Sequence, residues 1–185
     1  MGVGINDKHL VKRSEKLSFM ECGTTEKKFV RMEGFTDLGF NHNAKEYSRQ
    51  YVDEDTERTD TTGYSESVSY KFDRYKGNPV LEELVDITEE EKIGNDAVRR
   101  ILTVDLTTGS AIPGSSSDPN STGLGRICSG YVRDYAVVPN SNGDSTDCMT
   151  YSGDFKSRGK KTKLTKISVS ADGQTADGQT ATFEE

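Results

Sequence analysis

Apolar and polar residues alternate along much of the chain with a period of two, which is the pattern of a β-strand buried on one face. The clearest example spans residues 64–75, where Tyr64, Val68, Tyr70 and Phe72 share one parity and serine, lysine and aspartate fill the other. We expect these aromatic side chains to face a core. Related patterns predict strands at residues 16–22, 28–32, 35–40, 98–106, 126–138, 148–155 and 163–170.

The period changes to that of an α-helix over residues 79–92 (PVLEELVDITEEEK), where apolar residues recur three and four positions apart and carboxylates occupy the other side. Asn78 suits the N-cap and Pro79 the first helical position, while Lys92 and Gly94 suit the end. One helix among about seven or eight strands is typical of a mainly β fold. We therefore predict a β-sandwich or half-barrel with one flanking α-helix.

Three polar segments lack this periodicity. Residues 1–15 predict an N-terminal arm, and residues 171–185 predict a C-terminal tail that contains the repeat Ala-Asp-Gly-Gln-Thr twice in tandem. Residues 41–63 predict a long polar loop. Because loops of this length inside a compact domain are usually functional or ordered by a partner, we expect one of these two roles for this segment. The rest of residues 16–170 is expected to form one β domain.

The charge of the chain argues against nucleic-acid binding. It carries 24 Lys and Arg against 31 Asp and Glu, a net charge of −7, whereas domains that clamp nucleic acid are usually basic. Residues 156–166 hold six basic side chains, and we expect them to face an acidic loop or helix of another subunit. No stretch approaches the roughly 20 apolar residues that span a bilayer, so we expect no membrane anchor.

Candidate catalytic or metal-binding residues are few. The two histidines lie outside any nucleophile motif, and the three cysteines have no zinc-type spacing. Asp53, Asp55 and Glu57 have the alternate spacing of a calcium loop, but the Gly and the final Glu of an EF-hand are missing. We therefore expect no metal, no cofactor and no enzymatic activity.

Two runs follow one another in the order of polar loop, aromatic strand, helix and long strand. They are EYSRQYVDEDTERTDTTGYSESVSYKFDRY (46–75) and NPVLEELVDITEEEKIGNDAVRRILTVDL (78–106). In this order of elements they resemble the major tail tube protein of long-tailed, siphophage-type bacteriophages. The resemblance implies a virion structural protein that assembles in the host bacterial cytoplasm. It also implies hexameric rings whose sheets join into one barrel and that stack into a conduit for DNA during genome ejection.

The resemblance also implies that rings stack through three segments, which by position are the long assembly loop at residues 41–63 and the arms at residues 1–15 and 171–185. It further implies partners and candidate assembly residues. The partners are further copies of the chain, the tape measure protein and the tail terminator and distal tail proteins, while DNA passes through without specific binding. Two alternatives stay open: a tube protein of a contractile injection system, and a virion β-sandwich binding module. The candidate assembly residues are Tyr47, Arg49, Tyr51, Asp53, Glu54, Asp55, Glu57, Arg58, Lys160, Lys161 and Lys163.

The prediction of self-assembly depends on how the edges of the β-sheet are covered. Unpaired strand edges expose N–H and C=O groups, and a ring of subunits whose sheets join removes them. We therefore expect neighbouring molecules to complete the edges of this chain.

Overall fold

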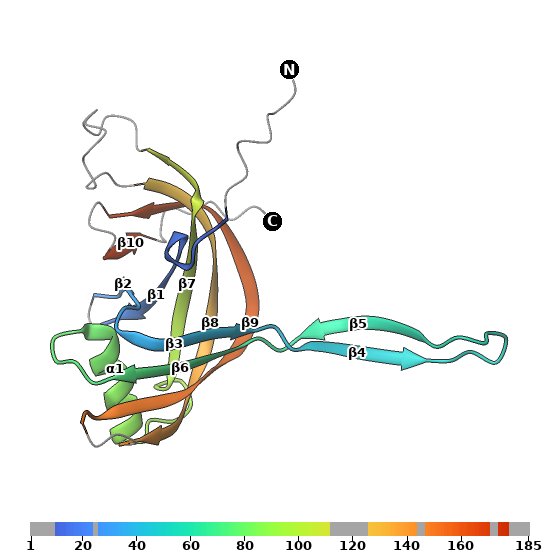
Figure 1. Cartoon of the computed structure of the whole chain (residues 1–185), viewed down its shortest axis with the longest axis horizontal. Helices are drawn as coiled ribbons and strands as arrows, with labels where there is room; N and C mark the ends of the chain where they lie inside the picture. Colours follow the sequence, from blue (N-terminus) through green and yellow to red (C-terminus); the bar gives the residue numbers. More distant parts are fainter. Residues whose placement is uncertain (1–9, 24–25, 112–125, 144–146, 171–173, 178–185) are drawn as a thin grey trace. The chain divides into compact units, whose positions relative to one another are not determined.

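The computed structural model describes residues 10–23, 26–111, 126–143, 147–170 and 174–177 (Figure 1). The chain is mainly β, with a large antiparallel sheet, a separate two-stranded ribbon and one α-helix in this described part. It divides into two compact units, and residues 16–170, expected to form one domain, contribute to both. The first unit comprises Met1–Met32, Arg100–Arg133 and Lys160–Glu185; the second comprises Glu33–Arg99 and Asp134–Gly159.

The first unit is built from six strands. They are β1 (Lys16–Cys22), β2 (Lys28–Arg31), β10 (Thr175–Asp177) and parts of β7 (Val98–Ala111), β8 (Arg126–Asn142) and β9 (Thr150–Val169). Their order is β10-β2-β1-β7-β8-β9, and β10 also pairs antiparallel with β9. The hydrogen-bonded neighbours therefore form a closed ring of strands.

Alternating side chains fill the core of the first unit, as the period-two pattern of β1 and β7 predicts. The buried side chains that contact one another are Leu17, Phe19, Leu102, Val104, Cys128, Leu164, Ile167, Val169 and Ala176. Cys22 and Cys128 are buried and form no disulfide, and Cys148 is exposed.

The C-terminal segment contains a short strand. Thr175–Asp177, within the predicted C-terminal tail, forms β10 between β2 and β9. Because β10 pairs on both sides, the same chain completes the edges of the first unit, where we expected a neighbour to do so. A strand of three residues has too short a pattern to be recognised by periodicity.

The second unit contains β3 (Phe35–Asn41), β6 (Ser67–Asp73), the remaining parts of β7, β8 and β9, and α1 (Pro79–Glu89). Strand β6 pairs with β3 on one side and with β9 on the other, and β3 ends the sheet among the described residues. Aromatic rings form its core: Phe72 stacks on Tyr151 at a centroid distance of 5.4 Å, and Tyr70 lies 4.7 Å from Phe155.

Burial agrees with the predicted parity at three of the four positions named for residues 64–75. Val68, Tyr70 and Phe72 are buried, but Tyr64 is 63% exposed. The reason is that Tyr64 ends another strand, β5, and β6 begins only at Ser67. The even spacing in the sequence continues from Tyr64 to Val68, but the two residues lie on different strands and therefore face different surroundings.

Helix α1 begins at Pro79 as predicted, and the side chain of Asn78 caps it by accepting hydrogen bonds from the amides of Val80 (3.0 Å) and Leu81 (3.4 Å). The buried face holds the expected Val80, Leu81, Leu84, Val85 and Ile87. The helix ends at Glu89, three residues earlier than predicted, because the chain turns at Glu91. Glu91 has a φ of +50°, and the amide of Lys92 then donates to the carbonyl of Ile87 (3.1 Å).

The left-handed turn at Glu91 leads to a prediction about stability. A side chain costs roughly 1–2 kcal/mol in this conformation, and glycine's extra freedom in the unfolded chain offsets part of the gain. We expect Glu91→Gly to raise the free energy of unfolding by about 0.5–1 kcal/mol in urea denaturation. The matched control is Glu90→Gly, at a φ of −89°, which is expected to destabilise the protein. Equal losses in both variants would contradict this account of the turn.

Residues 41–63 do not form the irregular loop expected from the sequence. They contain β4 (Ala44–Arg49) and β5 (Arg58–Tyr64), which pair as a two-stranded antiparallel ribbon that we call the ribbon. The ribbon continues β3 and leads back into β6, and it runs out beyond both strands (Figure 1). The alternation of apolar residues is absent here because both faces of the ribbon are polar.

The predicted arm is described only from residue 10 onward, and residues 1–9 lie outside the described part. Arg13–Glu15 forms a short 3-10 helix, where the amide of Lys12 donates to the carboxylate of Glu15 (2.7 Å). In the described segments, no helix has the length and apolar character needed to cross a membrane.

Candidate assembly surface

The ribbon is exposed along its whole length. All of β4 and all of β5 except Gly63 are exposed, and within the described chain each of the two strands pairs only with the other. One cross-strand contact joins the hydroxyls of Ser48 and Thr59 at 2.8 Å. A two-stranded hairpin without a hydrophobic face is at best marginally stable in water, so such an element is stabilised by what it packs against.

The free end of the ribbon is tied together by side chains predicted from the sequence. Arg49 lies 5.8 Å from the ring centroid of Tyr51 and donates to the hydroxyl of Tyr47 (3.4 Å). Arg58 forms an ion pair with Glu54, and the amide of Glu54 donates to the carbonyl of Tyr51 (3.1 Å). Arg49 and Arg58 lie opposite each other in the ribbon. Arg49 contacts aromatic groups and Arg58 contacts a carboxylate, which offsets the unfavourable pairing of two like charges.

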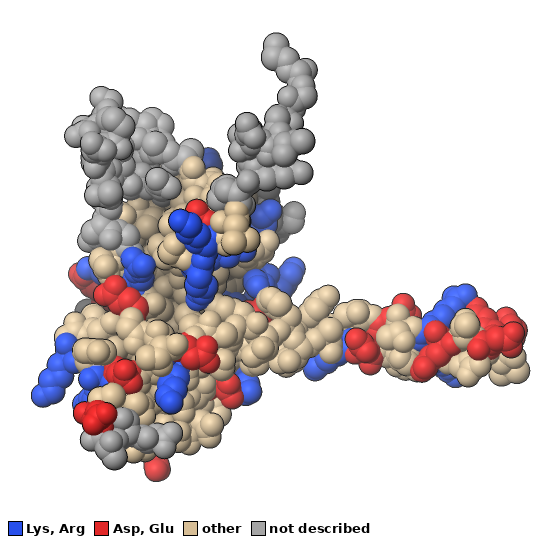
Figure 2. Space-filling view, in the orientation of Figure 1, with Lys and Arg blue, Asp and Glu red and all other residues tan. Residues whose placement is uncertain are grey.

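The free end is also acidic and carries apolar side chains. Residues 49–60 hold five carboxylates and two arginines, a net charge of −3, and the acidic side chains gather toward the end of the ribbon in Figure 2. Tyr47 and Tyr51 are about half exposed, and Val52 is fully exposed. Val52 was not among the residues predicted from the sequence. An apolar residue within a polar tract could have indicated it. Large exposed apolar groups ringed by charge are typical of protein contact sites.

A buried carboxylate lies at the base of the ribbon. Glu66, only 3% exposed, accepts a hydrogen bond from the hydroxyl of the equally buried Tyr135. The Nδ1 atom of His42 lies 3.0 Å from the other oxygen of Glu66, and the amide of Ser157 donates to the Glu66 carbonyl (2.9 Å). Glu66 thus connects the end of β3 to β8 and β9 where the chain enters the ribbon.

Asn43 fixes the crossing of the two chain segments at the same base. It has a φ of +28°, and its side-chain amide donates to the carbonyl of Ser65 (3.0 Å) and to the hydroxyl of Ser67 (3.2 Å). The amide of Ser65 donates to the Asn43 carbonyl in return (3.0 Å). This base was not predicted from the sequence. The residue that could have indicated it is Glu66, a carboxylate at a position of the same parity as the inward-facing Val68 and Tyr70.

The basic segment lies on β9 and is shared between the units. Lys160, Lys161 and Lys163 belong to the first unit, where Lys161 lies 5.0 Å over the ring of Tyr131. In the second unit, Lys156 pairs with Asp154 (3.2 Å), and Arg158 donates to Asn95 (3.0 Å). The structure therefore groups the eight predicted ribbon residues and places the three predicted lysines on another element.

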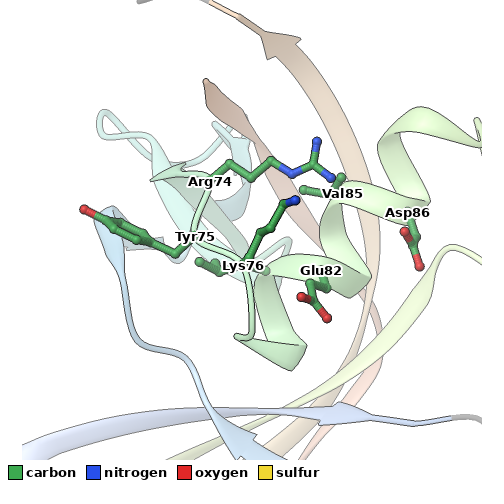
Figure 3. Close-up of a pocket in the computed structure, with 7 residues that line it drawn as sticks. Arg74, Tyr75, Lys76, Glu82, Val85 and Asp86 are labelled. Carbon is green, nitrogen blue, oxygen red and sulfur yellow. The ribbon is translucent and has the colours of Figure 1, made fainter. Parts of the chain in front are cut away.

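A cavity of about 250 Å³ lies beside α1 in the second unit (Figure 3). Leu81 and Val85 provide apolar lining, and charged side chains surround them, as Figure 3 shows for Arg74, Lys76 and Glu82 among others. Arg74 pairs with Glu89 (3.3 Å), and Glu82 accepts from the amide of Gly77 (2.8 Å). Arg74 and Glu82 are therefore already engaged with other groups of the chain.

Two tyrosines near this unit's core have altered acidity. Burial raises the pKa of Tyr70, and burial together with the Glu89 carboxylate raises the pKa of Tyr151. Both phenols therefore stay protonated at neutral pH, and Tyr151 donates to Glu89 at 2.5 Å. Within the residues that the structure places, three or more His, Cys, Asp or Glu side chains nowhere gather as metal ligands would.

Comparison with known proteins does not assign the chain to a family. The chain matches no family model and no curated protein. Among solved structures it is similar to a chain of the anti-feeding prophage (AFP) baseplate, determined by cryo-EM with six-fold symmetrisation. The TM-score is 0.47 at 8% sequence identity, and the match covers 85% of this chain and 97% of that chain. A likeness at this level assigns no function.

Proposed function

We propose that the chain is a structural subunit that assembles with copies of itself, and that it builds the tail tube of a virion. The ribbon supports this proposal more than any other feature. It is a long, exposed, two-stranded element with open edges in the described chain and an apolar, acidic end. The resemblance of residues 46–75 and 78–106 to tail tube proteins supplies the identity of the assembly.

Contact with a neighbour would stabilise the ribbon through its exposed apolar side chains. Complete burial of a Val, Leu or Phe side chain contributes about 1.5–3 kcal/mol, and Val52 and Tyr51 are of comparable size. Tyrosine is among the residues that most often supply the binding energy at the centre of an interface, which favours Tyr51 as the main anchor. The surrounding carboxylates would then set the orientation of the ribbon more than its affinity.

The basic side chains of β9 are the complementary surface that we assign to the neighbour. Lys160, Lys163 and Lys166 are exposed, and the free end of the ribbon carries a net charge of −3. Opposite charges steer the encounter of two copies and disfavour wrong registers. Asp53 and Asp55 lie near Val52 in sequence, so the same approach brings the apolar anchor into contact.

In this proposal, six copies form a ring and rings stack through their ribbons. The first unit already has its edges closed by β10, so joining of neighbouring sheets falls to the second unit, where β3 has an open edge in the described part. A net charge of −7 suits a conduit, because DNA is repelled by a negative wall and passes without binding. The tape measure and tail terminator proteins are further expected partners, and no enzymatic step is assigned.

Self-association of the purified chain tests the proposal. We expect rings or tubes in negative-stain microscopy and fast-sedimenting species in analytical ultracentrifugation. Raising the salt from about 50 mM to about 0.5 M should lower the assembled fraction, because the charged contacts are screened. Asp53→Asn with Asp55→Asn should weaken this salt dependence, while Glu90→Gln with Glu91→Gln makes the same charge change just beyond the end of α1 as a control. A persistent monomer at high concentration would refute the proposal.

A further inference from the structure

Strand β10 closes the ring of strands in the first unit with very few residues. Thr175 and Ala176 lie opposite Val30 and Phe29 of β2, and on the other side Ala176 lies opposite Val169 of β9. The link from β9 is short, because β9 ends at Val169 and β10 begins at Thr175. A three-residue strand therefore separates two edges that would otherwise be open.

The contacts that hold β10 are local and small. Its buried side chain is Ala176, which adds one methyl group to the core, and Thr175 is exposed. The Ser170 hydroxyl accepts a hydrogen bond from the Thr175 amide (3.0 Å) and lies 2.9 Å from the Thr175 carbonyl. The Arg31 amide donates to the carbonyl of Gln174 (2.8 Å). Removal of β10 thus exposes backbone groups of β2 and β9 but little apolar surface.

An open gap between two antiparallel edges accepts an added strand of matching length and register. The strand that fits this gap best is β10 itself, because small Ala176 meets the core at the point where β2 and β9 flank it. A second copy presents the same segment with the same register. Exchange of an identical element between copies keeps every native contact and needs only that the link opens.

We propose that β10 is an exchangeable strand and that the gap between β2 and β9 accepts β10 of a second copy. The contact is separate from the ribbon, and it gives each subunit a second junction. This inference rests on the proposed self-assembly for its biological use, but strand exchange itself needs only two copies.

Disulfide trapping between full-length chains tests the exchange. Val169 and Ala176 lie directly opposite each other, next to a pair in which the Ser170 amide bonds the Thr175 carbonyl (2.9 Å). They therefore form a closely spaced, non-hydrogen-bonded pair, with a geometry that a disulfide can bridge. One chain carries Val169→Cys and the other Ala176→Cys, both with Cys148→Ser to remove the exposed native thiol.

The two chains are mixed, incubated and oxidised, and the cross-linked dimer is measured on a non-reducing gel. We expect at least tenfold more dimer than from Ala176→Cys mixed with Lys166→Cys, an exposed position on β9 outside the β10 register. Val169→Cys with Ala176→Cys in one chain should close internally, and failure to close would refute the register. Ser170→Ala, which removes the hydroxyl holding the link, should speed formation of the mixed dimer.

The outcomes separate this inference from the proposed function. Tubes that form without dimer above the control would refute strand exchange and leave self-assembly standing. Dimer above the control in chains that never form rings or tubes would support strand exchange and refute the tail-tube proposal.

Discussion

Replacement of residues 46–62 by Asn-Gly is expected to abolish self-assembly and leave both units folded. The replacement joins Lys45 to Gly63, a pair already opposed at the base of the ribbon, through the two-residue turn that antiparallel strands prefer. Val52 is fully exposed and Tyr51 about half exposed, so loss of these two side chains alone removes about 2–4 kcal/mol of burial at the interface, a change of more than tenfold in association. Sedimentation velocity should show a monomer.

The stability of this variant distinguishes an assembly element from a structural one. The ribbon buries no side chain in the described structure of the free subunit. Its removal should therefore change the free energy of unfolding by less than about 0.5 kcal/mol, the range for surface changes. Assembly at the parental level would show that the ribbon is not the assembly element.

A milder pair of variants tests the anchor residues in the same assay. Tyr51→Ser with Val52→Ser changes two exposed apolar side chains at the free end and should weaken assembly strongly. Tyr75→Ser with Ile93→Ser changes two exposed apolar side chains elsewhere in the second unit and serves as the matched control. Equal effects in both pairs would point to general surface hydrophobicity as the cause.

The elements that could be predicted from sequence are those with one buried face. The alternation of Val68, Tyr70 and Phe72 predicted a strand, and the helical period with Asn78 as cap predicted α1, because burial of one face imposes that pattern. The fold class followed from these elements: the chain is mainly β with one helix and a large antiparallel sheet.

The ribbon shows why other elements escaped prediction. Strands β4 and β5 have no buried face, so their strand character rests on paired backbones and on residues such as Tyr47, Thr59 and Thr61. Strand β9 was predicted as two strands, at 148–155 and 163–170, because the lysines between them interrupt the apolar alternation. It is a single strand from Thr150 to Val169. In both cases hydrogen bonding to a partner strand decided the structure.

Part of the candidate site could be predicted from local sequence, and part could not because it depends on contacts between distant residues. The eight ribbon residues were identified because a charged tract is visible in the sequence, and they lie on one hairpin. The base was missed because Glu66 meets Tyr135 only in the fold, across a separation of 69 residues. A contact between segments that are distant in sequence leaves no local pattern. The one local sign was that Glu66 is a carboxylate at a position predicted to face inward.

Glu66→Ala is expected to lower the free energy of unfolding by about 2–3 kcal/mol, the second large effect that the structure predicts. The substitution takes the acceptor away from the buried Tyr135 hydroxyl and leaves a cavity beside it. A buried donor that loses its partner costs roughly 1–3 kcal/mol, and the cavity left by the shortened side chain adds to this cost. Urea denaturation under conditions where the chain is monomeric measures the loss.

Matched variants identify the hydrogen bond to Tyr135 as the source of the effect. Tyr135→Phe removes the donor and keeps the ring, and Glu66→Gln keeps the size and an acceptor oxygen, so each should cost less than Glu66→Ala. In the double variant Glu66→Ala with Tyr135→Phe, the loss should be clearly smaller than the sum of the two single losses, because the unpaired hydroxyl is gone. Additive losses would show that the two side chains act independently.

The same substitution connects the fold to assembly. His42 and Asn43 hold the entry to the ribbon, and His42 contacts the chain's buried interior through Glu66. If Glu66 orients the ribbon, Glu66→Gln should reduce the assembled fraction more than its small effect on stability explains. The control is Glu91→Gln, an exposed carboxylate in the same unit. Parental assembly by Glu66→Gln would show that the base stabilises the fold without directing the ribbon.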